Sequence, residues 1–258
     1  MWSVNQMPKR KMQRKKSDKK YSKKRQRLQR SSSDKEIMAN AKKEKREDIS
    51  KEAETKFLIP LNQYLATGIH IGMRARTKDM EKFIYKIRQD KLAVFDISKV
   101  DERIRLAANL LSTYEPNEIL AVSRKRNGHK PVYMFAKATG ANCFYGRFMP
   151  GTLTNPNYEK YMEPKIIIIT DPFADSQAFQ EAIKSNITII AMCDTFDQTK
   201  YIDLVIPMNN KGRKSVALAY YLLAKEYLKL RGEIKSDDEF PYKLKDFEMP
   251  IAAKRNIV

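Results

Sequence analysis

Two uninterrupted apolar runs constrain the fold most: KIIIITD at 165–171 and NITIIAMCD at 186–194. Neither run alternates apolar with polar residues, as a strand with one solvent-facing side does, so both predict strands that are buried on both faces. The segment between them, Asp175–Lys184, is predicted to be a helix with Asp175 or Ser176 as its N-cap. Strands of this kind joined through a helix are typical of a parallel sheet covered on both sides.

The same alternation of strands and helices continues over the rest of the chain. The predicted strands at 83–88 and 92–97 are joined by a link, residues 89–91, that is short enough for a hairpin. The elements together predict a three-layer α/β/α domain with a mainly parallel sheet. Further strands are expected at 83–88, 92–97, 118–123, 141–145 and 202–208, and further helices at 57–69, 101–114, 131–139 and 215–231.

The formal net charge of +20 is spread unevenly along the chain. Residues 1–56 hold 20 basic and 8 acidic residues, a net charge of +12, and have no apolar period. We therefore expect a disordered basic extension at 1–56, an α/β domain at 57–232 and an extended C-terminal tail at 233–258. The basic balance predicts an anionic polymer as partner. No apolar run approaches the ~20 residues that span a bilayer, so we expect no membrane partner.

A loop rich in Gly, Pro and short polar residues, GRFMPGTLTNP, occupies residues 146–156. Such a run cannot continue a helix or a central strand. It contains no Asp, Glu, His or Cys, and therefore no general acid, base or metal ligand. Its candidate contacts are the cation Arg147 and the polar side chains of Thr152, Thr154 and Asn155. This inventory predicts a binding surface rather than a catalytic centre.

Three basic clusters lie in predicted loops. A helix N-terminus flanked by Lys and Arg suits phosphate groups, although most charged runs are simply solvated surface. Because several clusters occur on a domain that is itself basic, nucleic acid is the favoured partner. The clusters are Arg74, Arg76 and Lys78; Arg124, Lys125 and Arg126, followed by His129; and Asn209, Asn210, Lys211, Arg213 and Lys214.

An enzymatic alternative rests on three carboxylates, Asp96, Asp171 and Asp194, which end predicted strands. At the carboxyl ends of a parallel sheet they could form a metal-dependent phosphoryl-transfer site. The favoured interpretation is that they form Asx turns and cap the following helices. The chain has no GxGxxG after its first strand and no GxxxxGK[ST]. We therefore expect no catalytic residue, no metal, no cofactor and no small-molecule substrate.

Seven segments of the domain resemble the S2 family of small-subunit ribosomal proteins. The resemblance lies in the archaeal and eukaryotic branch, which includes the laminin-receptor precursor, and it covers roughly residues 57–232. The order and spacing of the segments make it specific. They are GIHIG at 68–72, KFIYKIRQDKLAVFDISK at 82–99, YEPNEILAVSRK at 114–125, GRFMPGTLTNP at 146–156, EPKIIIITDPFADSQAFQEA at 163–182, ITIIAMCDT at 187–195 and IDLVIPMNNKGRKSVAL at 202–218.

The length of one link indicates the branch. Bacterial members carry a long coiled-coil insertion after the loop equivalent to GTLTN, whereas only residues 156–163 separate that loop from the next strand here, too few for heptads. The chain therefore resembles the archaeal form most. One departure is Lys91, which stands where the family often has Gly in a turn.

The resemblance carries several expectations. It implies a flavodoxin-like (Rossmann-like) fold without catalysis and a cytoplasmic location in the small ribosomal subunit. The implied partners are small-subunit rRNA and neighbouring ribosomal proteins. An RNA-binding regulator that acts outside the ribosome remains the alternative.

Overall fold

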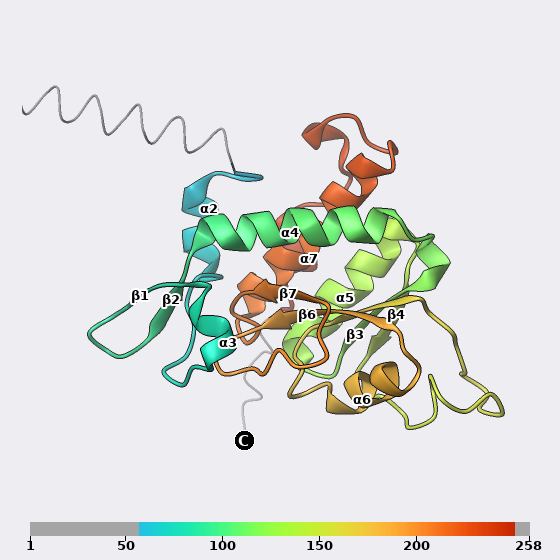
Figure 1. Ribbon diagram of the computed structural model, residues 1–258. Helices are drawn as coiled ribbons and strands as arrows, with labels where there is room; N and C mark the ends of the chain where they lie inside the picture. Colours follow the sequence, from blue (N-terminus) through green and yellow to red (C-terminus); the bar gives the residue numbers. More distant parts are fainter. Residues whose placement is uncertain (1–56, 251–258) are drawn as a thin grey trace, which may run out of the picture. The chain divides into compact units, whose positions relative to one another are not determined.

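A computed structural model describes residues 57–250 of the chain, so the predicted basic extension at 1–56 lies outside the described residues (Figure 1). Five strands form a parallel sheet in the order β4-β3-β5-β6-β7. Counted along the chain, this is the order 2-1-3-4-5 of flavodoxin-like sheets. The predicted fold class is therefore confirmed. The strands are β3 (Ile119–Ser123), β4 (Asn142–Tyr145), β5 (Ile166–Ile169), β6 (Thr188–Cys193) and β7 (Leu204–Pro207).

Helices cover both faces of this sheet. Figure 1 shows α4 (Ile97–Ser112), α5 (Arg126–Thr139) and α7 (Arg213–Leu230) on one side and α6 (Ser176–Lys184) on the other. Every residue of β3 and β5 is buried, as the unbroken apolar runs predict for strands between two layers. Within the described residues, no helix is long and apolar enough to cross a membrane.

A smaller antiparallel hairpin precedes the main sheet. It consists of β1 (Ile84–Ile87) and β2 (Ala93–Phe95), which confirms the predicted hairpin. The helices α2 (Leu61–Thr67) and α3 (Lys78–Glu81) precede it in the chain. In the turn, Lys91 has a φ of 64°, so a lysine occupies a left-handed position that favours glycine.

Two glycines directly follow the last residues of helices. Gly68 follows α2 with a φ of 70°, and Gly140 follows α5 with a φ of 76°. Both values lie in the left-handed region, where a side chain would be strained. The ends of these helices are thus encoded locally.

Helices α4 and α5 both begin well before their predicted starts. Helix α4 begins at Ile97 rather than at residue 101, because the carboxylate of Asp96 accepts a hydrogen bond from the Ser98 N–H at 3.1 Å and caps the helix. Helix α5 begins at Arg126 rather than at Pro131, which lies inside it. Proline there removes one backbone donor, but its φ suits a helix. Burial of Pro131 and the nearby Phe135 offsets the missing bond.

The predicted extended C-terminal tail is wrong for the part that the structure describes. Phe240 and Phe247 are buried, and their rings lie 5.4 and 5.7 Å from that of Tyr221 in α7. Lys225, also in α7, forms an ion pair with Asp237 at 2.9 Å. These anchors have no helical or strand period, so the sequence pattern does not reveal them. The short helices here are η2 (Asp237–Glu239) and α8 (Leu244–Phe247), and η1 (Pro116–Glu118) precedes β3.

Candidate nucleic-acid interface

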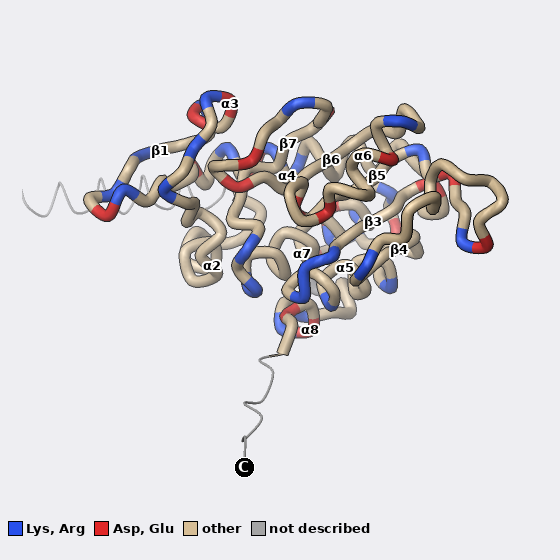
Figure 2. Tube along the Cα trace, turned by 90° about the horizontal axis from the view of Figure 1, so that it is seen from below, with Lys and Arg blue, Asp and Glu red and all other residues tan. Residues whose placement is uncertain are grey.

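The predicted basic clusters meet at the carboxyl edge of the parallel sheet. In a sheet of this order, the strand sequence reverses between β3 and β5, and ligands gather in the crevice outside that point. Arg124 and Lys125 follow β3 directly, and Asp171 follows β5. In the view from below, basic stretches lie beside α5 and α7, the helices that leave this edge (Figure 2).

Asp175 ties the loops after β3 and β5 together. Its buried carboxylate accepts hydrogen bonds from the Arg124 N–H at 2.6 Å and the Asp171 N–H at 3.1 Å. Burial raises the pKa of this carboxyl to about 6, against the lowering effect of the two backbone donors. Asp175 stands at the predicted N-cap of α6, but its side chain does not cap that helix. It holds the backbone of Arg124 instead.

Asp171 takes the role that the favoured interpretation predicts. One of its oxygens accepts hydrogen bonds from the Phe173 and Ala174 N–H groups at 3.0 and 3.2 Å, which forms an Asx turn. The other oxygen pairs with the ammonium group of Lys125. Because Asp171 is fully buried, the Lys125 ammonium group neutralises a charge inside the protein. Lys125 is therefore engaged by Asp171 rather than available to an external ligand.

The three carboxylates of the enzymatic alternative do not gather at one edge. Asp96 follows β2 in the separate hairpin sheet and caps α4. Asp194 follows β6 and accepts a hydrogen bond from the Thr195 N–H at 2.7 Å. In the part of the chain that the structure describes, no three His, Cys, Asp or Glu side chains are grouped as metal ligands.

The segment from Asn209 to Lys214 is shaped by its own side chains. The Asn209 side-chain oxygen accepts hydrogen bonds from the Lys211 and Gly212 N–H groups, both at 3.0 Å. Asn210 is buried and donates to the Met192 carbonyl at 3.1 Å and to the Asp197 carboxylate at 2.9 Å. The side chains of both asparagines therefore support the loop, and little of either is left to contact a partner.

The cations of this segment differ in exposure. Arg213 donates to the Met249 carbonyl at 2.9 Å, and the Lys211 ammonium lies 3.9 Å from the centroid of the Phe196 ring. Lys214 is exposed. Of the predicted set, Lys214 is thus the one turned most fully to solvent.

The loop at 146–156 is held from outside. The buried carboxylate of Glu181 in α6 accepts hydrogen bonds from the Gly151 and Leu153 N–H groups, both at 3.0 Å. Thr152 is buried and donates its hydroxyl to the Met149 carbonyl at 2.7 Å. The predicted contacts that remain exposed are Arg147, Thr154 and Asn155.

The first basic cluster is fastened to the end of β6. The Thr195 hydroxyl accepts a hydrogen bond from the Met73 N–H at 3.0 Å and donates to the Ala75 carbonyl at 2.8 Å. A Cβ on Gly72 would lie 2.5 Å from the Thr195 methyl group, so this close approach requires glycine. Arg74, Arg76 and Lys78 are exposed on the resulting segment.

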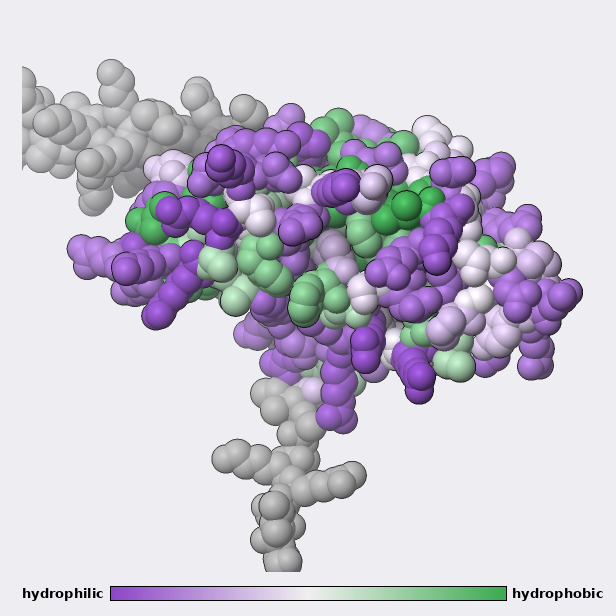
Figure 3. Space-filling model, turned by 60° about the horizontal axis from the view of Figure 1, so that its bottom comes forward, coloured by the Kyte–Doolittle hydropathy of each residue, from purple (hydrophilic) through white to green (hydrophobic). Residues whose placement is uncertain are grey.

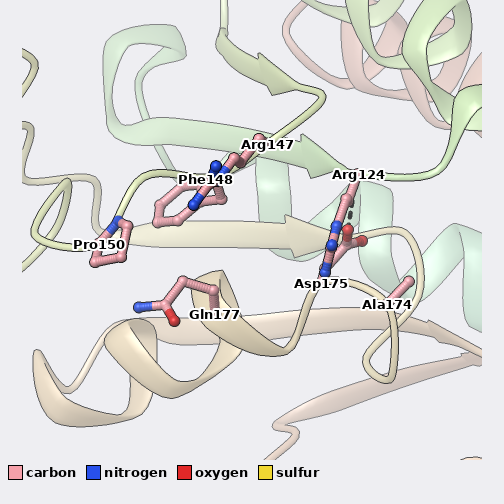
Figure 4. A pocket seen from close by; sticks show the side chains of 7 residues that line it. All are labelled: Arg124, Arg147, Phe148, Pro150, Ala174, Asp175 and Gln177. Carbon is pink, nitrogen blue, oxygen red and sulfur yellow. Dashed lines mark hydrogen bonds between the residues drawn. The ribbon is translucent and has the colours of Figure 1, made fainter.

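A pocket of about 210 Å³ joins two of the predicted sets. Figure 4 shows Arg147 and Phe148 above it, Gln177 of α6 below it, and Arg124 with Asp175 at one end. Both arginines are exposed at its rim. Two guanidinium groups around a hollow at the switch point form an arrangement that suits a phosphate group.

Sequence reasoning missed the residues that fix these loops. Glu181 is one carboxylate in the middle of a helix, and Thr195 is one hydroxyl after a strand, so neither carries a local signal. It also missed Phe173, which follows β5 and is 77% exposed. The sequence gives no clear signal here either, because single apolar residues are common on protein surfaces.

The family match and three similar proteins all indicate the same family. Residues 64–161 and 157–229 match the family described as Ribosomal protein S2. The small ribosomal subunit protein uS2 of Nanoarchaeum equitans is 50% identical over 197 residues, which cover 76% of this chain and 98% of the relative. Its counterpart in Staphylothermus marinus is 49% identical over 216 residues, 82% of this chain and 98% of that protein. The Picrophilus torridus counterpart is 50% identical over 198 residues, with 77% and 99% covered.

All three organisms are archaea, which agrees with the predicted branch. The structure agrees as well, because residues 156–163 contain turns and no helix.

Proposed function

Because this chain belongs to the ribosomal protein S2 family, we propose that it is a structural constituent of the small ribosomal subunit, where it binds rRNA and neighbouring ribosomal proteins. The relatives carry the name of a small-subunit protein and match nearly their whole length. The observation that supports RNA binding most is the pocket flanked by Arg124 and Arg147. A cytoplasmic location in the small subunit follows from the same proposal.

The interface divides its polar groups between two tasks. Buried carboxylates and amides of Asp171, Asp175, Glu181 and Asn210 fix the loops from within. Cations on the same loops face outward and are the proposed phosphate contacts. These exposed cations are Arg74, Arg76, Lys78, Arg124, Arg126, Arg147 and Lys214.

We propose no catalysis at this edge, although the fold also serves many enzymes. Asp171 is engaged by two backbone donors and by Lys125, and Asp194 by the Thr195 N–H. These contacts explain both carboxylates as groups that support the loops. The family assignment points to a structural role in the same way.

The basic extension at 1–56 adds a second contribution. Its net charge of +12 is expected to neutralise phosphates and release counterions, which makes affinity depend steeply on salt. This contribution carries no sequence preference. The shape of the folded edge must therefore provide the placement on RNA.

The double variant Arg124→Glu/Arg147→Glu tests the folded interface in the full-length chain. We expect weaker binding to a small-subunit rRNA transcript, with the slope of log affinity against log salt reduced by about two, since two phosphate contacts are lost. Lys184→Glu is the matched control, because Lys184 is exposed at the opposite end of α6 from the pocket. Unchanged affinity and slope in the double variant would contradict the proposed contact.

The regulator alternative is tested by sedimentation of a cell lysate. We expect the protein in the small-subunit peak. Its absence from that peak, with RNA binding intact, would favour a role outside the ribosome.

A further inference from the structure

Two phenylalanines occupy equivalent places after neighbouring strands. Strand β5 is followed by Thr170 and then Asp171-Pro172-Phe173, and β6 by Asp194-Thr195-Phe196. The strands pair in parallel, with Ile169 opposite Ala191. This register brings the two Phe residues together at the carboxyl edge. Their ring centroids lie 6.3 Å apart with an angle of 69° between the planes.

Phe173 is held outward by the structure beneath it. At 77% it is the most exposed large hydrophobic side chain among the described residues. Its backbone N–H donates to the buried Asp171 carboxylate at 3.0 Å, and Lys125 fixes the other oxygen of that carboxylate. These contacts hold the backbone that carries the ring, and the ring lies at the surface on this turn.

A cation completes this group. The Lys211 ammonium lies 3.9 Å from the Phe196 ring centroid, and this contact covers one face of that ring. Phe173 packs edge-to-face against Phe196 and keeps most of its own surface open. The space-filling view shows separate apolar areas between hydrophilic side chains on this side of the molecule (Figure 3).

We propose that Phe173, supported edge-on by Phe196, forms a stacking platform for an unpaired nucleotide of RNA, with Lys211 near its phosphate. The proposal rests on the proposed function and deepens it by naming where a single-stranded base binds. Every base presents a flat π face to an aromatic ring, and the adjacent phosphate needs a cation. An RNA occupant is favoured over a protein by charge, because exposed Arg74 and Arg76 lie on the segment bonded to Thr195, next to Phe196.

The first test measures affinity of the full-length chain for a single-stranded oligoadenylate of about 12 nucleotides. We expect Phe173→Ala to weaken binding about 5- to 100-fold, the range of one lost stacking contact, and Phe173→Trp to retain it. Neither change affects the core, because the side chain is exposed. Tyr85→Ala is the matched control: Tyr85 is 70% exposed but lies on β1, in the hairpin.

The salt dependence separates stacking from charge. Phe173→Ala should leave the slope of log affinity against log salt unchanged, whereas Lys211→Ala should reduce it by about one. An abasic oligonucleotide of equal length and charge should bind wild type and Phe173→Ala equally. A similar loss with the abasic probe would overturn the stacking model.

A fluorescence signal tests the contact directly. The chain contains a single tryptophan, Trp2, so the double variant Trp2→Phe/Phe173→Trp carries one reporter at the platform. Stacking should quench its emission on addition of the oligoadenylate but not of the abasic probe. Tyr85→Trp in the same Trp2→Phe background should show no quenching.

Three outcomes separate this proposal from the function on which it rests. If Phe173→Ala binds as wild type while Arg124→Glu/Arg147→Glu loses affinity, the platform is wrong and the RNA-binding function stands. If the wild-type protein is absent from small subunits and does not bind their RNA, the proposed function itself is wrong. If Phe173→Ala loses only a neighbouring ribosomal protein from assembled subunits, the surface docks protein and the platform is overturned.

Discussion

The loops at 146–156 and 209–214 both present cations at the carboxyl edge, but the side chain that accepts hydrogen bonds from their backbone N–H groups lies outside the first loop and inside the second. The first contains no acidic residue, and Glu181 of α6 accepts its Gly151 and Leu153 N–H groups. The second is held by Asn209 within the loop itself. A loop can thus be shaped from a distance or from within, and only the second kind leaves a local signal in the sequence.

The largest expected effect comes from removing the distant support. Glu181→Ala leaves two backbone donors without their carboxylate partner and should lower the free energy of unfolding by about 3 kcal/mol. Urea denaturation followed by circular dichroism measures this change. Glu181→Gln keeps one acceptor oxygen and should cost less. Equal stability of all three proteins would show that Glu181 does not shape the loop.

Removing the internal support should cost less, because Asn209 is only half-buried whereas Glu181 is buried, so water can more readily replace the lost acceptor. Asn209→Ala removes an acceptor from the Lys211 and Gly212 N–H groups and should cost about 1 to 2 kcal/mol. Asn209→Asp retains that acceptor and is the matched control. The comparison fails if Asn209→Ala destabilises the protein more than Glu181→Ala in the same denaturation assay.

The difference between the loops also limits what could be predicted from the sequence. The buried strands β5 and β6 were predictable, because their isoleucine-rich runs fit only a covered sheet. The start of α5 was not, since Pro131 suggests a helix start and is instead buried inside the helix. The C-terminal segment was missed because Phe240 and Phe247 pack singly on α7 without a period.

The same limit applies to the interface. The sequence predicted that the basic clusters lie in loops and favour nucleic acid, but not that these loops meet at one edge. Charge and polarity could not show that Thr152 and Asn210 are buried, because their bonds to Met149 and Asp197 depend on the folded conformation of the loops. The roles of polar residues in a loop depend on such contacts, so those two predictions of RNA contact compete with a structural role.

A third prediction uses pH to distinguish a carboxylate support from an amide support. The pKa of Asp175 is raised to about 6 in the folded chain, so the folded state binds a proton more readily than the unfolded state. Its contribution to stability is therefore largest below the unfolded pKa and is lost as pH rises through about 6. As the pH falls from about 7 to about 5, protonation of Asp175 should raise the free energy of unfolding by about 1 kcal/mol.

Denaturation at several pH values checks this contribution. Asp175→Asn should flatten the pH dependence of stability over that window. Asn209→Ala, which removes an uncharged support, should leave it unchanged. An equal pH dependence in wild type and Asp175→Asn would contradict the assignment.

The smallest effect is expected at a turn that has neither kind of support. In the hairpin, the Lys91 N–H donates to the Arg88 carbonyl at 2.9 Å, and the lysine takes a left-handed φ of 64°. Among the residues that the structure describes, the Lys91 side chain has no hydrogen bond or ion pair that would offset the strain, and the position suits glycine. Lys91→Gly should raise the free energy of unfolding by about 1 kcal/mol at most, because the relief of strain is partly offset by the greater backbone entropy of unfolded glycine. Lys91→Ala, which keeps a Cβ, is the matched control for loss of the lysine charge. If the alanine and glycine variants are equally stable, the strain at this position is negligible, and the turn is shaped by its backbone hydrogen bonds alone.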